Sequence, residues 1–197
     1  WACTFAIHAA KNCGEEHVKA ALQILFQSED TCHVELAKNI LSEMTVVLPG
    51  EFPIVTPTIL WEAFWMHISS ERYQSAASIV HCLLSSGAGC LLHEERAVMD
   101  ILRSQKLPEN LRDGIVKLMV VHAPESILEE PEVLLAKDPN QRTTRFCSAL
   151  GAFSAAADLK LFYDSVAAAL SCRGISLDDG IAERIEKMVS ARKKAGL

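Results

Sequence analysis

The sequence predicts an all-α fold in which about ten helices stack as antiparallel pairs, the arrangement of an α-solenoid. Apolar residues recur at helical spacing along most of the 197 residues. The nine glycines and seven prolines are few and fall at intervals, as expected for helices joined by short turns. Runs of β-branched residues, such as 45–47, lie inside helical patterns, so we expect a single helical domain over 1–197 and no strand.

Three helices are expected before the first proline. The first covers about 1–13 and ends before a glycine. The second covers about 15–27 and opens with two glutamates, which are favourable at a helix N-terminus. The third covers about 32–47, and either Asp30 or Thr31 is suited to cap it.

Residues 49–57 interrupt the helical pattern. Prolines at both ends and in the middle of this segment exclude a helix and favour an extended strap. The segment also contains apolar residues, so we expect it to lie across the helices. It is predicted to join two sub-bundles, residues 1–48 and 57–197.

The rest of the chain reads as further helices with short connections. Four are expected over about 58–68, 71–86, 93–104 and 108–122, and short turns follow between Pro124 and Pro131. Pro139 opens a helix that is predicted to reach about residue 157, and Asp158 is predicted to cap another that ends near Cys172. The motif Ser176-x-x-Asp179 resembles a capping box for a last helix, through about Lys193.

Composition limits the classes of function. A net charge of −6 and a pI near 5.6 argue against a generic nucleic-acid binder. No apolar run approaches the roughly 20 residues that cross a bilayer. The seven cysteines are odd in number and scattered, which favours a reducing compartment, cytoplasm or nucleus. Because the chain starts at a tryptophan, we expect it to be part of a longer protein.

No motif predicts a cofactor, a metal or an enzymatic reaction. His81, Cys82, Cys90 and His93 are possible zinc ligands, but adjacent helical residues diverge by about 100° and Cys90-x-x-His93 is half a site. Catalytic serine, phosphate-binding and dinucleotide motifs are absent from the sequence. A non-enzymatic protein is therefore expected; a cysteine–histidine nucleophile pair stays an open alternative.

Two groups of residues are candidates for binding a partner. Trp61, Phe64 and Trp65 share a helix face, where aromatic residues serve either the core, the default interpretation, or a binding surface. The other group is acidic and consists of Glu129, Glu130 and Glu132. It is interpreted first as a solvated turn and second as a rim that attracts a basic partner.

Two segments resemble helical-repeat families. Residues 72–87 resemble the second helix of a pentatricopeptide repeat, with central alanines, an aliphatic pair and a closing glycine. Residues 162–178 have a similar exit from helix to glycine, and the helix pairs starting near 58 and 93 are about 35 residues apart. The resemblance to tetratricopeptide and pentatricopeptide repeats implies stacked pairs with a groove for a peptide, a helix or single-stranded RNA.

These observations predict an intracellular scaffold or adaptor domain. It would bind a peptide or helix of a partner protein, or a second copy of itself, through an apolar groove with an acidic rim. No membrane and no small-molecule substrate are expected. The alternative is RNA binding by pentatricopeptide-like repeats, which requires a basic strip on an acidic protein.

Overall fold

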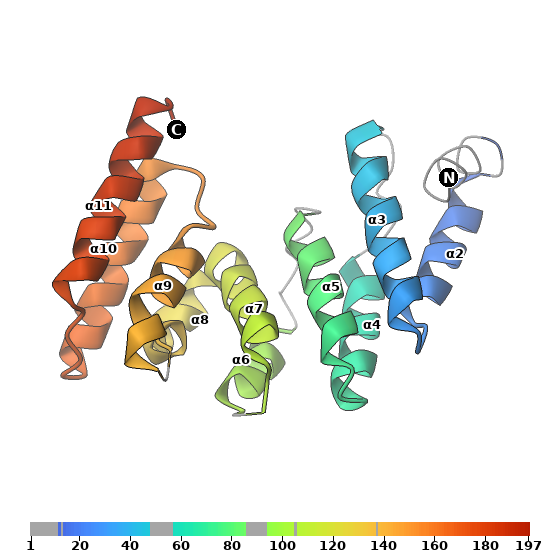
Figure 1. Cartoon of the computed structure of the whole chain (residues 1–197), viewed down its shortest axis with the longest axis horizontal. Coiled ribbons are helices and arrows are strands. Elements are labelled where there is room, and N and C mark those ends of the chain that lie inside the picture. The colour runs from blue at the N-terminus through green and yellow to red at the C-terminus, as the bar shows by residue number, and fades with distance from the viewer. Residues whose placement is uncertain (1–11, 13, 48–56, 86–93, 105, 137) are drawn as a thin grey trace. The chain divides into compact units, whose positions relative to one another are not determined.

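The computed structural model describes residues 12, 14–47, 57–85, 94–104, 106–136 and 138–197, and within these ranges the protein is all-helical (Figure 1). They form ten α-helices, labelled α2 to α11, and one 3₁₀ helix, with no strand among them. The predicted fold class is therefore confirmed. The helix expected over 1–13 and nearly all of the strap lie outside the described residues.

The chain divides into two compact units, residues 1–90 and 91–197. The boundary between these units falls after residue 90, whereas the sequence placed a junction of two sub-bundles at residues 49–57. Helices before and after that segment pack on each other, so the segment falls inside the first unit.

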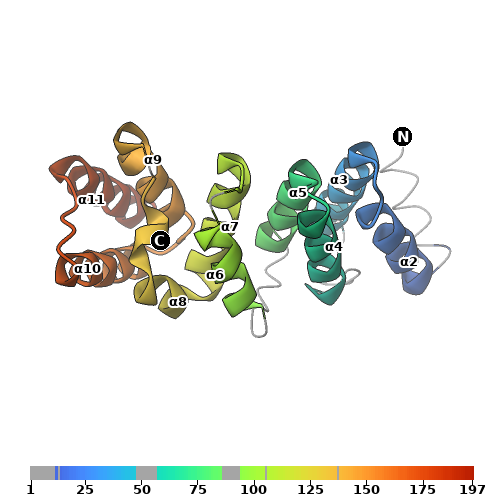
Figure 2. The same cartoon turned by 90° about the horizontal axis from the view of Figure 1, so that it is seen from below.

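The described residues of the first unit form two stacked helix pairs (Figures 1 and 2). Helix α2 packs against α3 and α4, and α5 packs against both α3 and α4. The two pairs are separated by the same distance in the sequence: α4 begins 42 positions after α2, and α5 begins 42 positions after α3. The bounds are α2 Glu15–Phe26, α3 Thr31–Val47, α4 Pro57–Ser69 and α5 Tyr73–Ser85.

The core of the first unit is mainly aliphatic and aromatic. Helix α4 is apolar nearly all round, and six of its side chains are buried, because it packs against helices of both pairs. The fully buried side chains of the unit come from all of its helices and include Leu22, Phe26, Val34, Leu60, Phe64 and Ile79.

Polar contacts among the described residues of the first unit include ion pairs, such as Arg72 with Glu29, and buried hydrogen bonds of serines and a histidine. Ser75 and Ser78 are buried where α5 meets α3, and Ser78 Oγ donates to Glu35. His67 is fully buried on α4, and its Nε2 lies 2.8 Å from the carbonyl oxygen of Phe26, to which it donates. Because Phe26 ends α2, this bond joins the two helix pairs.

The second unit contains three helix pairs, of which the middle one begins with a very short helix. The pairs are α6 with α7, α8 and the 3₁₀ helix η1 with α9, and α10 with α11. Helix α9 also packs on α7 and α11, and α10 packs on α8 and η1. The bounds are α6 Glu95–Arg103, α7 Glu109–His122, α8 Pro124–Glu129, η1 Pro131–Leu134, α9 Pro139–Leu150, α10 Ala156–Cys172 and α11 Asp179–Lys194.

Helix α9 is shorter than the sequence suggested. It ends at Leu150, not near residue 157, and α10 begins at Ala156 without a side-chain cap from Asp158. Gly151 follows α9 where a Cβ atom would lie 3.1 Å from the carbonyl oxygen of Ser148. Arg192 of α11 then donates to the carbonyls of Gly151 and Phe153, at 3.1 and 3.0 Å. These bonds satisfy carbonyls that continuing the helix would otherwise have satisfied.

The start of α11 also differs from the prediction. Its N-cap is Asp178, whose Oδ1 accepts from the backbone N–H of Ile181 at 2.9 Å. The predicted capping motif, Ser176 with Asp179, therefore lies close to the cap but does not form it. Thr143 of α9 donates to the other oxygen of Asp178 at 3.2 Å, which fixes this cap against α9.

Candidate functional site

The three predicted aromatic residues lie together on α4 in the first unit. The Trp61 and Phe64 rings are 5.3 Å apart edge to face, and Trp65 stacks on Trp61 with centroids 6.2 Å apart. Trp61 is 5% exposed and Phe64 is fully buried, so these two belong to the core. Trp65 is half-buried and is the member of the group that keeps some exposed surface.

The three predicted glutamates lie in the second unit, where α8 passes into η1. Pro124 starts α8 and Pro131 starts η1, so one proline precedes all three acidic residues and the other lies between Glu130 and Glu132. Glu129 ends α8, Glu130 connects the two helices and Glu132 belongs to η1. The two prolines restrict the backbone of this short segment, which carries the three carboxylates.

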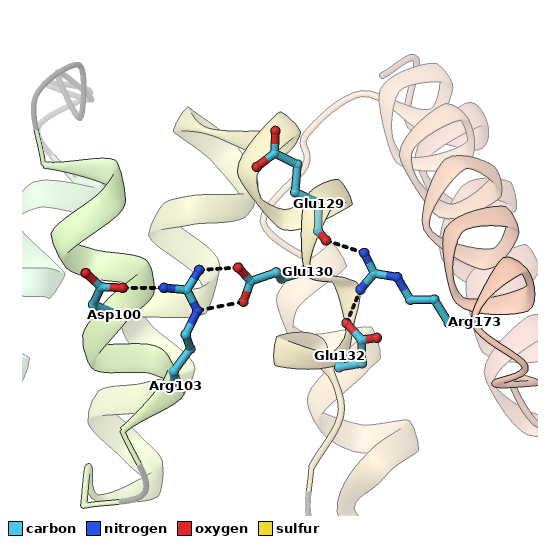
Figure 3. A network of polar contacts seen from close by, with 6 residues as sticks. All are labelled: Asp100, Arg103, Glu129, Glu130, Glu132 and Arg173. Atoms are coloured by element: carbon cyan, nitrogen blue, oxygen red, sulfur yellow. Dashed lines mark hydrogen bonds and ion pairs between the residues drawn. The ribbon is translucent and has the colours of Figure 1, made fainter.

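Arg103 binds this segment from α6 (Figure 3). Its Nε donates to Glu130 at 2.8 Å and its Nη2 donates to the other oxygen of the same carboxylate, so the pair is bidentate. Asp100, one turn earlier on α6, accepts from Nη1. The hydrogen bonds from Arg103 hold the pKa of Glu130 below its usual value.

Arg173 binds the same segment from the end of α10 (Figure 3). It donates through Nη1 to the carboxylate of Glu132 and through Nη2 to the backbone carbonyl of Glu129. Burial alone would raise the pKa of Glu132, but the bond from Arg173 contributes to a pKa that is lowered overall. Two of the predicted glutamates are therefore engaged inside the unit.

Glu129 differs from its neighbours. Its carboxylate points away from both arginines (Figure 3) and makes no ion pair with any described residue. Of the three predicted glutamates, it is the one whose negative charge is available to a partner.

A hollow of about 460 Å³ opens beside Glu129, between α6 and α8. Ser126 on α8 donates to Glu95 on α6 at 3.1 Å across it, and the largely buried Met99 adds an apolar surface. The lining residues are Glu95, Arg96, Met99 and Arg103 from α6, Ser126 and Glu129 from α8, and Glu130, which follows α8.

Two buried arginines were not anticipated from the sequence. Arg145 on α9 is 6% exposed and pairs with Glu109 and with Asp113 on α7; its Nε lies 2.8 Å from Asp113 Oδ1, although not in hydrogen-bond geometry. Arg112 is 9% exposed and donates to the carbonyl of Ser104 at 2.9 Å. Both fall at core-facing positions of their helices, which is the signal that could have identified them.

The potential metal ligands of the sequence do not form a cluster within the described ranges. No three histidine, cysteine, aspartate or glutamate side chains gather there in a way that could hold a metal ion. Cys82 is buried, which raises its thiol pKa to about 12, while the adjacent His81 is exposed. Cys90 and His93 lie outside the described residues.

Among the described helices, none combines the length and the apolar character needed to cross a membrane. Comparisons with protein-family models, with curated proteins and with solved structures find no match to this chain.

Proposed function

We propose that this chain is a non-enzymatic helical scaffold, and that its second unit binds a basic segment of a partner protein at the hollow between α6 and α8. The observation that carries this proposal is the unpaired carboxylate of Glu129 at a hollow whose walls are held together by ion pairs. Because Arg103 and Arg173 fix the α8–η1 segment, little ordering would be needed when a partner binds.

The charges of the hollow favour a cation. Arg103 and Glu130 neutralise each other in an ion pair, and Asp100 pairs with the same guanidinium. The remaining charged side chains are Glu95 and Glu129 against Arg96. A lysine or arginine of the partner would bring its charge to Glu129, and its aliphatic part would pack on Met99.

This site differs from the apolar groove that the sequence led us to expect. The hollow is lined mainly by charged and polar side chains, with Met99 as its apolar residue. Exposed ion pairs contribute little each, and salt weakens them. Binding is therefore expected to be moderate in affinity, fast and sensitive to ionic strength.

Affinity capture with matched variants tests the proposal. Wild-type protein, Glu129→Gln, Glu95→Gln and the control Glu125→Gln are immobilised, and proteins retained from cell extract are quantified. Glu125 is exposed on the same helix but does not line the hollow. Proteins retained by wild type and Glu125→Gln are expected to fall about fivefold or more with either hollow variant. They are then purified, and their binding is measured at low and high salt.

Two results would contradict the proposal. In the first, the hollow variants retain the same proteins as wild type, whereas Trp65→Ala loses them. That result would place binding on α4. The other is retention that ribonuclease abolishes, which would favour the RNA-binding alternative.

A further inference from the structure

A second hollow in the same unit has the opposite character. It has a volume of about 400 Å³ and lies between α9 and α11, which pack on each other. Its lining residues carry a guanidinium, an ammonium, two hydroxyls and a thiol, and no carboxylate is among them. They are Thr144, Cys147 and Ser148 from α9, and Arg184, Lys187 and Met188 from α11.

The two cations of this hollow are available to a ligand. Arg184 is exposed and makes no ion pair with any residue that the structure describes. Lys187 lies 2.6 Å from Glu183 on its own helix, with both side chains about 70% exposed (72% and 69%). Such an exposed pair is weak, so the ammonium can exchange Glu183 for a stronger acceptor.

Asp178 is an acid close to this hollow, but it is not among the lining residues. Both carboxylate oxygens of Asp178 are already used, by the N–H of Ile181 and by the hydroxyl of Thr143. Cys147 in the lining is 8% exposed, and burial raises its thiol pKa; the charge of Arg184 lowers this pKa and the charge of Asp178 raises it. The thiol therefore stays protonated at neutral pH and is a neutral part of the lining.

We propose that this hollow binds the phosphate group of a phosphoserine or phosphothreonine on a partner protein. A phosphate ester presents close to two negative charges and three acceptor oxygens. Arg184, Lys187, Thr144 and Ser148 offer the matching charges and donors from two adjacent helices. A glutamate side chain would supply one charge and two oxygens, so it is expected to bind less well.

A nucleic acid fits the surroundings less well. Its affinity comes from many phosphates that are neutralised along a track. Here the carboxylates of Asp178, which acts on Cys147, and of Glu183, which lies beside Lys187, would repel a second phosphate nearby. The site thus suits one phosphate group on a protein. It is separate from the hollow between α6 and α8, so a negative test of one site leaves the proposal for the other site unaffected.

Titrations of the ¹⁵N-labelled chain followed by NMR test this proposal. The probe is N-acetyl-phosphothreonine N-methylamide, compared with its unphosphorylated form, the equivalent glutamate derivative and a short oligouridylate. We expect saturable millimolar shifts centred on residues 144–148 and 184–188 with the phosphorylated probe, weaker shifts with glutamate and none with threonine. Arg184→Gln should weaken binding about tenfold. Lys193→Gln, which removes an exposed charge from the same helix but not from the hollow, should leave it unchanged.

Several outcomes would overturn the proposal. These are no saturable shift with the phosphorylated probe, shifts centred away from α9 and α11, and an equal loss of affinity in Arg184→Gln and Lys193→Gln. Tighter binding of oligouridylate than of the phosphothreonine probe at the same residues would also overturn it, in favour of RNA.

Discussion

The two units of this chain are built from stacked helix pairs but are stabilised in different ways. Residues 1–90 contain nine acidic and only four basic residues, whereas residues 91–197 contain sixteen acidic and fifteen basic ones. In the first unit, buried aromatic and aliphatic side chains fill the space between helices of regular length. In the second, arginines connect helices that are far apart in the sequence.

The length of the helices explains this difference. Each described helix of the first unit has 12 to 17 residues and can bury a long apolar stripe. Helix α8 has six residues and η1 has four, so neither can bury much apolar surface. Arg103 and Arg173 hold this segment from two sides, and the same arrangement leaves charged groups at the surface, where a partner can reach them.

The largest effect is expected in the core of the first unit. Phe64→Ala removes a fully buried ring and should cost about 3–5 kcal/mol of unfolding free energy. Glu62→Ala changes an exposed residue of the same helix and should stay within about 0.5 kcal/mol. Urea unfolding gives the two values, and hydrogen exchange should show lost protection in α2 to α5. A small cost for Phe64→Ala would mean that packing does not dominate there.

The matching test in the second unit is Arg145→Ala. This change removes a buried arginine from carboxylates of Glu109 and Asp113 that are 60% and 39% exposed, so it should cost about 2 kcal/mol, less than the loss of a fully buried pair. Arg142→Ala removes an exposed arginine from the same helix, whose hydrogen bond to a backbone carbonyl is long at 3.3 Å, and should cost less than about 1 kcal/mol. Equal urea midpoints for these two variants would contradict the importance of buried ion pairs in this unit.

The buried histidine of the first unit predicts a pH dependence. Burial lowers the pKa of His67 below its ordinary 6.5, and the nearby Arg72 acts in the same direction, while the bond to the Phe26 carbonyl opposes them. As pH falls below about 6.5, the unfolded chain takes up a proton that the folded chain does not, so stability falls.

His67→Gln should remove this dependence, because its amide can donate to the same carbonyl without titrating. Between pH 7.5 and 5.5, the wild type should lose more unfolding free energy than the variant, by no more than about 1.4 kcal/mol per pH unit. If the unfolding free energies of the two proteins fell equally with pH, His67 would not control the loss of stability at low pH.

The smallest effect is expected at the exposed arginines around α8. Arg173→Gln should increase hydrogen exchange in α8 and η1 several-fold at low salt and much less in molar salt, because its ion pair with Glu132 is largely exposed. Arg192→Gln is not a suitable control, since Arg192 satisfies helix carbonyls. Lys193→Gln provides one instead. Equal exchange in Arg173→Gln and wild type at low salt would contradict a stabilising role of Arg173 for α8 and η1.

The sequence was sufficient for the fold class and for most helix bounds, because apolar spacing is a local signal. It did not place the end of α9, since the Arg192 contacts that satisfy the terminal carbonyls come from 39 and 41 positions away. The aromatic group was recognised as sharing one face of α4, but its burial depends on α2 and α5.

The acidic segment shows the same limit. Glu129, Glu130 and Glu132 could be selected as a charged group from their spacing. The arginines that pair with Glu130 and Glu132 lie 27 and 41 positions away, and no local pattern connects them. Which glutamate stays unpaired therefore depends on the packing of α6, α8 and α10, which only the structure supplies.

Photo-crosslinking from each unit tests most directly whether the second unit carries the partner-binding surface. Benzoylphenylalanine replaces Arg96, which is exposed at the hollow between α6 and α8, or Ile24, which is 70% exposed on α2 of the first unit. Position 96 is expected to crosslink a partner protein, and Glu129→Gln in the same chain is expected to reduce the yield. Crosslinks that form at position 24 and not at position 96 would contradict this account.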